Sequence, residues 1–396
     1  MAILDENEAT PILATPPTDL FDELRRREFG ALEGTTWLNS ASIGPLPERT
    51  VRLLDSFNRK RSAPYLLPDP ELFEIFAESR RLIAQLIGAS ADEIALSTNT
   101  SYGLNIAALA LPLERGDIVL VSDREFPANV YPWLHLRSRG IEVELLPVTD
   151  EGWPDEPRLL ERIQDPRVRV LAVSLVQFSN GYAVDLDTLS RATRATGTYL
   201  VVDAIQGLGQ VPVDLRRTPV DILSSGGQKW LLAPWGSGFT YVRRELIGQL
   251  VPPLAGWTAF EGTDDFSELT RYSTEFRDTA RRFETITLPF QDFAGFNESL
   301  RLILQVGPDR IGAHARECHE PIIAWAHRAG VRVSSPVGHH GSAILCVAPP
   351  DAAAAHARLR DAGIYCSLRE GSIRLSPHLF NTIDEMGGVV EALEGR

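Results

Sequence analysis

The chain has 396 residues, of which 44% are hydrophobic and 23% charged, and its net charge is −14 because 53 acidic side chains outnumber 39 basic ones. This composition suits a globular protein of roughly two or three domains and excludes disordered, collagen-like and coiled-coil classes. An acidic surface disfavours binding to nucleic acid and to anionic membranes. No apolar run reaches the length of a transmembrane helix, and the acidic N-terminal segment lacks the apolar core of a signal peptide. The three widely spaced cysteines exclude a disulfide framework and a four-cysteine zinc site. We therefore expect a cytoplasmic protein with no nucleic-acid, membrane or metal partner.

The first part of the chain predicts helices and one strand-like piece before any sheet begins. Residues 1–34 are interrupted by prolines and are expected to form an N-terminal arm with one short helix near 20–29. A strand-like piece with a small-residue loop follows at 35–47. Apolar residues at helical spacing then predict helices over 47–61 and 73–88.

After residue 90, short apolar runs alternate with helical or loop stretches. This alternation predicts an α/β fold with a mainly parallel, seven-stranded sheet flanked by helices and right-handed crossovers. We expect a large domain over 35–255, whose first part packs with a smaller α+β domain over 256–396 that includes a long helix at 289–306. The predicted strands of the large sheet are 93–97, 117–123, 143–148, 168–176, 198–204, 221–227 and 237–244.

Polar side chains follow several of these strands, where ligands bind in open α/β sheets. Thr98, Asn99 and Thr100 lie between a strand and a helix start, where hydroxyls, free N–H groups and the helix dipole favour an anion. Taken alone, these residues favour simple N-capping over an anion site. Asp203 ends another strand, and a buried carboxylate there needs a cationic partner, which a protonated heterocycle or an arginine could supply.

Lysine occurs only twice, at Lys60 and Lys229. Lys60 lies among charged residues on a predicted helix, as a solvated lysine does. Lys229 lies among glycines and apolar residues, and this setting should desolvate the amine and lower its pKa. A lowered amine pKa suits Schiff-base chemistry, although a snorkelling lysine would look the same in isolation.

The order of anion site, strand-end Asp203 and apolar Lys229 resembles the fold-type I pyridoxal-phosphate enzymes of the class-V aminotransferase group. The resemblance spans about residues 35–385. Two motifs, QKWLLAPWGSGF (228–239) and IRLSPHLFNT (373–382), are similar to those of its isopenicillin-epimerase-like branch.

The resemblance implies pyridoxal 5'-phosphate as cofactor and an amino acid as substrate. Lys229 would bind the cofactor aldehyde, Asp203 would pair with its ring nitrogen, and Gln206 would bind its phenolic oxygen. Arg374 would grip the substrate carboxylate, and Arg369 would be either a second anion-binding residue or a surface arginine. The remaining implied site residues are Thr98, Asn99 and Thr100 with Ser225 or Gln228 at the phosphate, Phe126 against the ring, Gln177 near cofactor and substrate, Asn39 and Ser40 at the substrate pocket, and Thr287 reaching the neighbouring subunit of a homodimer.

Departures from the family pattern bear on the reaction. In this family, histidine is frequent against the cofactor ring and directly before the lysine, but Phe126 and Gln228 occupy these positions here. A desulfurase cysteine follows the arginine of its motif, whereas Cys366 precedes Arg369. We therefore favour a C–S lyase that performs β-elimination on an S-substituted cysteine in secondary metabolism. The alternatives are an amino-acid epimerase, a decarboxylation-coupled oxidative deaminase, an aminotransferase, and a binding protein with a decayed site.

Overall fold

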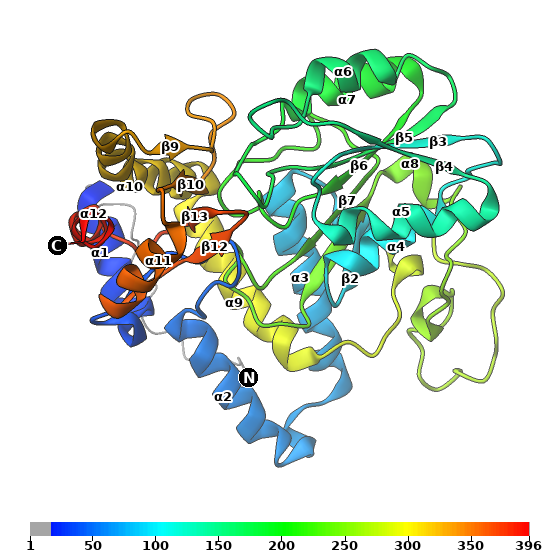
Figure 1. The fold of residues 1–396 in the computed structure, drawn as a ribbon. Helices are drawn as coiled ribbons and strands as arrows, with labels where there is room; N and C mark the ends of the chain where they lie inside the picture. The colour runs from blue at the N-terminus through cyan, green and yellow to red at the C-terminus, as the bar shows by residue number, and fades with distance from the viewer. Residues whose placement is uncertain (1–16, 396) are drawn as a thin grey trace.

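The computed structural model describes residues 17–395 of the chain. Its centre is a seven-stranded sheet in the order β2-β8-β7-β6-β5-β3-β4 (Figure 1). Only β8 runs antiparallel to its neighbours β2 and β7, so the expected α/β fold with a mainly parallel sheet is confirmed. The strands are β2 (Ile94–Ser97), β3 (Ile118–Ser122), β4 (Glu142–Leu146), β5 (Val168–Ser174), β6 (Tyr199–Asp203), β7 (Ile222–Gly226) and β8 (Gly238–Val242).

Helices cover both faces of this sheet, which explains why its strands are almost uniformly apolar. Because side chains alternate along a strand, Val119 and Val121 of β3 face one apolar cluster while Ile118 and Leu120 face the other. The first cluster includes side chains of α4 (Thr100–Ala110), α5 (Tyr131–His135) and α8 (Arg244–Ile247). The second includes those of α3 (Asp69–Ile87), α6 (Glu156–Arg162), α7 (Leu186–Thr196) and α9 (Phe290–Val306).

A smaller α+β unit follows α9, with a four-stranded sheet in the order β12-β13-β10-β9. Its longest helix, which spans residues 308–329, was not predicted from sequence because Pro321 and three histidines obscure the pattern. Its buried residues still recur at helical spacing, from Ile311 through Ala315 and Cys318 to Ile322. The elements are β9 (Arg332–Val333), β10 (Leu345–Ala348), β11 (Ile364–Tyr365), β12 (Ser367–Arg369), β13 (Ser372–Leu375), α10 (Pro308–Ala329), α11 (Ala352–Asp361) and α12 (Glu385–Glu394).

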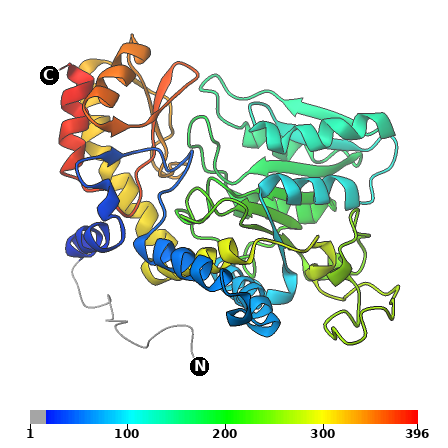
Figure 2. The ribbon, with the colours of Figure 1, turned by 90° about the horizontal axis from the view of Figure 1, so that it is seen from below.

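The N-terminal segment is built into this smaller unit. The first sixteen residues of the expected arm lie outside the described residues; α1 (Pro17–Glu28) lies beside α12, where Arg25 and Glu385 form an ion pair of 2.7 Å (Figures 1 and 2). β1 (Thr36–Trp37) pairs in parallel with β11, so the strand-like piece expected at 35–47 adds to the small unit. The chain then continues into α2 (Glu48–Arg61), which packs on α9.

None of the helices within residues 17–395 combines the length and the apolar character that crossing a lipid bilayer requires.

Candidate active site

The carboxyl ends of β2, β3, β5, β6 and β7 meet at one edge of the large sheet, because these five strands run in the same direction. This is the edge at which open α/β sheets bind their ligands. Most of the predicted cofactor ligands lie at the ends of these strands or just after them, namely Thr98, Asn99, Thr100, Phe126, Gln177, Asp203, Gln206, Ser225, Gln228 and Lys229.

Lys229 lies after β7, with its Nζ 5.5 Å from the centre of the Phe126 ring. Burial lowers the pKa of Lys229 to about 8, with further lowering from the charges of Arg374 and Arg369, whereas the charge of Asp203 opposes the shift. Roughly a tenth of the amine is therefore neutral and nucleophilic at pH 7, far more than for an ordinary lysine. Phe126 keeps part of its ring exposed beside this amine and packs edge-to-face on Phe178, with ring centres 5.2 Å apart.

Asp203 is a buried carboxyl group that forms no ion pair among residues 17–395. Its carboxylate accepts a hydrogen bond from the backbone N–H of Ile205, at 3.1 Å. Burial raises the pKa of Asp203 to about 7, although the Lys229 amine opposes this, and the charge of Glu125 adds to it. A buried acid in this state lacks a cationic hydrogen-bond partner, and a protonated ring nitrogen of a cofactor would supply one.

Glu125 is a buried residue of this edge that sequence analysis missed. Its carboxylate accepts hydrogen bonds from the Ser174 backbone N–H (2.8 Å), the Ser174 hydroxyl, Gln177 Nε2 (2.6 Å) and Asn129 Nδ2 (3.2 Å). Burial raises the pKa of this carboxyl, and the four donors oppose the rise. Glu125 directly precedes Phe126, so it anchors the loop that holds the aromatic ring and fixes the Gln177 amide. The sequence signal was an acidic residue at a strand end.

The expected phosphate residues surround the start of α4. Asn99 caps this helix by accepting a hydrogen bond from the Tyr102 N–H at 3.0 Å, and its own amide donates to the Thr98 hydroxyl at 3.1 Å. Thr98 and Asn99 are exposed to solvent. The Thr100 hydroxyl instead accepts from the Gly226 N–H at 2.9 Å, and the Ser225 hydroxyl donates to the Gly226 carbonyl at 3.1 Å. The Thr100 hydroxyl therefore connects α4 and β7, whereas the bond of the Ser225 hydroxyl stays within β7.

Gln206 connects the sheet edge to the N-terminal loop. Its amide nitrogen donates to the Ala41 carbonyl at 2.9 Å, and its oxygen accepts from the Trp230 indole at 2.9 Å. Gly44 of the same loop donates to the Gln228 carbonyl at 2.9 Å. A Cβ added at Gly44 would lie 2.2 Å from the Lys229 carbonyl oxygen, so only glycine permits this close approach.

The N-terminal loop also meets the hairpin of β12 and β13. Ser367 donates to Asn39 Oδ1 at 2.6 Å, and Arg374 donates to the Ser42 hydroxyl at 2.8 Å and to the Phe178 carbonyl at 2.7 Å. Ser40 is buried, and its hydroxyl has no partner within the described part of the chain. The structure thus brings Asn39, Ser40 and Arg374 together beside the strand ends.

Arg374 is a buried guanidinium bonded only to neutral oxygens within residues 17–395, and its Nε has no partner there. Burial lowers the pKa of Arg374 to about 10, and the charge of Arg369 contributes, whereas Cys346 opposes the shift. An anion such as a substrate carboxylate would satisfy this group.

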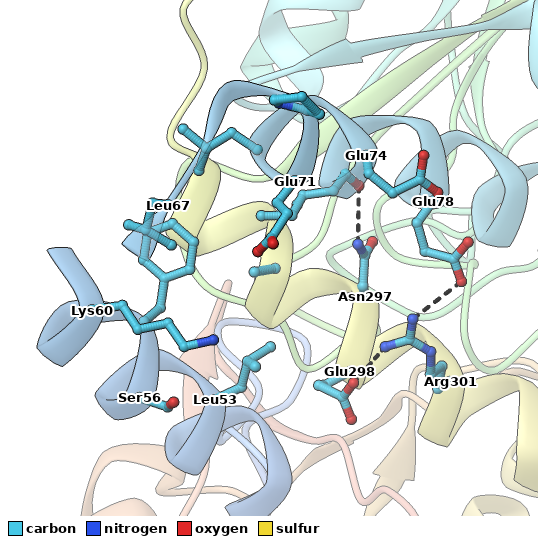
Figure 3. Close-up of a pocket in the computed structure, with 15 residues that line it drawn as sticks. Leu53, Ser56, Lys60, Leu67, Glu71, Glu74, Glu78, Asn297, Glu298 and Arg301 are labelled. Carbon is cyan, nitrogen blue, oxygen red and sulfur yellow. Dashed lines mark hydrogen bonds and ion pairs between the residues drawn. The ribbon is translucent and has the colours of Figure 1, made fainter. Parts of the chain in front are cut away.

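Thr287 lies apart from these residues. It is exposed and lines a hollow with Pro64, Leu67 and Gln291, and none of the residues that line this hollow belongs to the sheet edge that holds Lys229. Lys60, the other lysine, lines a groove of about 710 Å³ between α2, α3 and α9 (Figure 3). None of the residues that line this groove is a predicted site residue.

The family model described as aminotransferase class-V matches residues 62–375, which is most of the chain. The chain belongs to the class-V aminotransferase family. Among curated proteins, this class-V chain is 28% identical to a probable cysteine desulfurase of Methanothermobacter thermautotrophicus, over 93% of the chain and 96% of that protein. It is also 28% identical to isopenicillin N epimerase of Amycolatopsis lactamdurans, over 93% of the chain and 97% of that protein.

Solved structures share the fold of this class-V protein. The apo cysteine desulfurase of Thermococcus onnurineus NA1 superposes with a TM-score of 0.84 at 22% identity, covering 94% of this chain and 97% of that one. The cystine C–S lyase C-DES, in complex with its product cysteine persulfide, gives a TM-score of 0.83 at 20% identity, covering 92% and 99%.

Pyridoxal phosphate is the cofactor of this class-V enzyme, as sequence analysis expected. The residues present fit the group: the amine of Lys229 suits its aldehyde, the unpaired carboxyl of Asp203 suits its ring nitrogen, and the exposed face of Phe126 suits its ring.

Proposed function

We propose that the protein is a C–S lyase that removes the sulfur substituent from an S-substituted cysteine by β-elimination. The observation that carries this proposal is the Lys229 amine, which faces Phe126 and has a lowered pKa, together with three cysteine thiols whose pKa values are all raised by burial.

The three cysteines support elimination over a desulfurase reaction, in which a thiol must attack sulfur. Burial raises the pKa of Cys318, Cys346 and Cys366 to about 12 each, so their thiolate fraction at neutral pH is very small. Cys346 Sγ also donates to the Ser179 carbonyl at 3.2 Å, and Cys318 lies in the core of the small unit.

In the proposed reaction, bound pyridoxal phosphate supplies an electron sink for the electron pair left when a substrate Cα proton is removed. Lys229, once free as an amine, accepts that proton, and its lowered pKa raises the fraction of the amine that is neutral and able to do so. Arg374 holds the α-carboxylate, and Asp203 provides the negative charge that keeps a ring nitrogen protonated. The sulfur leaves with the bonding electrons and takes a proton; addition of one water then gives pyruvate and ammonia beside the thiol.

We further propose that the enzyme works as a homodimer in which Thr287 serves the neighbouring site. Several large apolar side chains are exposed on and around the segment that precedes Thr287, and such clusters mark interfaces. Phe266 and Trp257 of this segment pack edge-to-face on Phe73 of α3, next to the residues that flank Thr287. The exposed side chains are Tyr65, Leu66, Trp235, Val251, Leu254, Trp257, Phe266, Leu269 and Tyr272.

Product analysis of the cofactor-loaded protein with a panel of S-substituted cysteines tests the proposed reaction. We expect equal amounts of pyruvate, ammonia and thiol. Lys229→Ala should abolish this activity and the absorption band of the covalently bound cofactor, whereas Lys60→Ala, which changes the only other lysine, should leave both unchanged. Solvent deuterium in recovered substrate without any pyruvate would reject elimination.

That last result would instead favour the second candidate, an amino-acid epimerase. The similarity to isopenicillin N epimerase over 93% of the chain motivates it. Epimerisation needs the same proton removal by Lys229 but returns a proton to the opposite face of Cα, so the substrate sulfur stays in place.

A further inference from the structure

The hairpin of β12 and β13 presents two arginines on one face. Leu368 and Ile373 pack into the core of the small unit. Because strand residues alternate between faces, Arg369 and Arg374 lie on the opposite face. In the register of the hairpin, Ser367 is paired with Arg374 and Arg369 with Ser372, which makes the two arginines diagonal neighbours on that face. Arg374 bonds Phe178 and Ser42, so this face is the one directed at the candidate active site.

The tip of the hairpin lies beside the loop that carries Phe126. Glu370 forms an ion pair with Arg124 at 3.6 Å, and Arg124 comes two residues before Phe126 in the sequence. Both residues of the pair adopt left-handed backbone conformations, with φ of 61° at Arg124 and 46° at Glu370, which residues other than glycine rarely adopt. Two sharp turns, one from each sheet, therefore meet here, and Arg369 precedes one of them, next to the loop that carries Phe126.

Arg369 itself has no acidic partner among residues 17–395. Its side chain donates to the carbonyl of the preceding residue, Leu368, at 3.1 Å, and the adjacent acid Glu370 is paired with Arg124. Its positive charge acts on both Lys229 and Arg374 and helps to lower the pKa of each. The site thus contains one buried and one exposed guanidinium, and neither is neutralised by a carboxylate of the described chain.

We propose that Arg369 binds a second acidic group, at the far end of the substrate side chain, while Arg374 binds the α-carboxylate. This inference deepens the proposed function and rests on it for the amino-acid nature of the substrate. The substrate class is an S-substituted cysteine whose substituent carries a carboxylate. A guanidinium binds such a group in a bidentate, charge-assisted geometry, and a neutral substituent would leave Arg369 without that partner.

Binding of two ligands without sulfur tests this subsite separately from any reaction. 2-Aminoadipate has the shape of S-carboxymethylcysteine with a methylene in place of sulfur, and its side-chain amide has the same shape without the second charge. Calorimetric titration of the cofactor-loaded protein should give a Kd for the acid on the order of tenfold lower than for the amide. Arg369→Gln should remove this preference, and Arg369→Lys should keep part of it.

Arg360→Gln is the matched control, because Arg360 is an exposed arginine on α11 of the same unit. It should keep the full preference for the acid. Equal Kd values for acid and amide in the unchanged protein, or a preference that survives in Arg369→Gln, would overturn the proposal. Since neither ligand can lose sulfur, these results do not depend on whether S-substituted cysteines yield pyruvate, which decides the proposed function.

Discussion

Asp203, for which we propose a role in holding the cofactor, carries a cost to stability. Its folded-state pKa of about 7 exceeds the ordinary value of 3.8, so between these pH values the folded protein without cofactor keeps a proton that the unfolded chain has lost. The stability of the cofactor-free protein therefore falls as pH rises through this window. The full shift corresponds to at most about 4 kcal/mol above pH 7.

Asp203→Asn should remove this cost, because the amide has no charge to bury. We expect the cofactor-free variant to be more stable than the parent protein in urea unfolding, by a margin that grows from pH 5.5 to about pH 7 and then stays constant. With cofactor, its activity should fall by about 100-fold or more, since the ring nitrogen loses its anionic partner. Asp361→Asn, at an exposed aspartate, is the control. A stability difference between Asp203→Asn and the parent protein that is the same at every pH would contradict this prediction.

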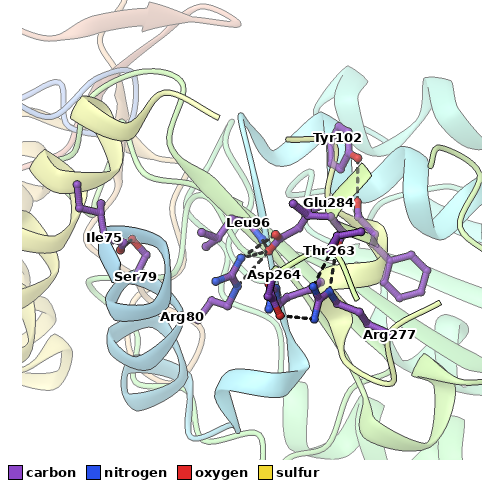
Figure 4. Close-up of polar contacts among 12 residues, drawn as sticks. Ile75, Ser79, Arg80, Leu96, Tyr102, Thr263, Asp264, Arg277 and Glu284 are labelled. Carbon is purple, nitrogen blue, oxygen red and sulfur yellow. Dashed lines mark hydrogen bonds and ion pairs between the residues drawn. The ribbon is translucent and has the colours of Figure 1, made fainter. Parts of the chain in front are cut away.

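At the scale of elements, a buried ion pair joins the edge of the large sheet to the segment that leads into α9 (Figure 4). Glu284 is fully buried and accepts hydrogen bonds from the Arg80 guanidinium of α3, the shortest at 2.7 Å, and from the Leu96 N–H of β2 at 2.8 Å. Nearby, Arg277 donates to the Thr263 hydroxyl and pairs with Asp264 at 2.8 Å. One carboxylate thus connects three elements that are distant in sequence.

Glu284→Gln should destabilise the protein by about 3–5 kcal/mol, because it leaves the nearly buried Arg80 without a counter-charge. The free energy of unfolding in urea measures this. Glu268→Gln breaks the exposed ion pair with Arg271 and should cost less than about 1 kcal/mol. An equal loss of unfolding free energy in the two variants would show that the buried ion pair stabilises the protein no more than the exposed one.

The strands and the polar residues at their ends could be predicted from the sequence, because both are encoded in short local patterns. An apolar run followed by Asp203, or by glycines and Lys229, carries the information in a few neighbouring residues. The role of Glu125 depends instead on Ser174 and Gln177, which lie about fifty positions away, and no local pattern encodes those bonds. Helix α10 was missed for a different reason, since Pro321 masks a buried face that only packing against the small unit reveals.

At the scale of the whole molecule, the proposed homodimer predicts the effect of a surface charge. Tyr272 is 86% exposed, so Tyr272→Asp should leave the fold intact while placing a charge in the proposed interface. We expect folded monomers in sedimentation velocity, with weaker cofactor binding because the neighbouring Thr287 is lost. Val337→Asp changes an apolar side chain that is 69% exposed in the small unit and should remain dimeric. A parent protein that sediments as a monomer would rule out this interface.

The pairing of β1 with β11 has a consequence for biosynthesis. Thr36 and Trp37 find their partners only when Ile364 and Tyr365 have left the ribosome, more than three hundred residues later. Until then the loop that presses Gly44 against Lys229 has one end untethered, although every strand of the large sheet has already been translated. The candidate active site is therefore completed late in synthesis, and a nascent chain that stops before residue 364 would carry Lys229 without the pairing that tethers this loop.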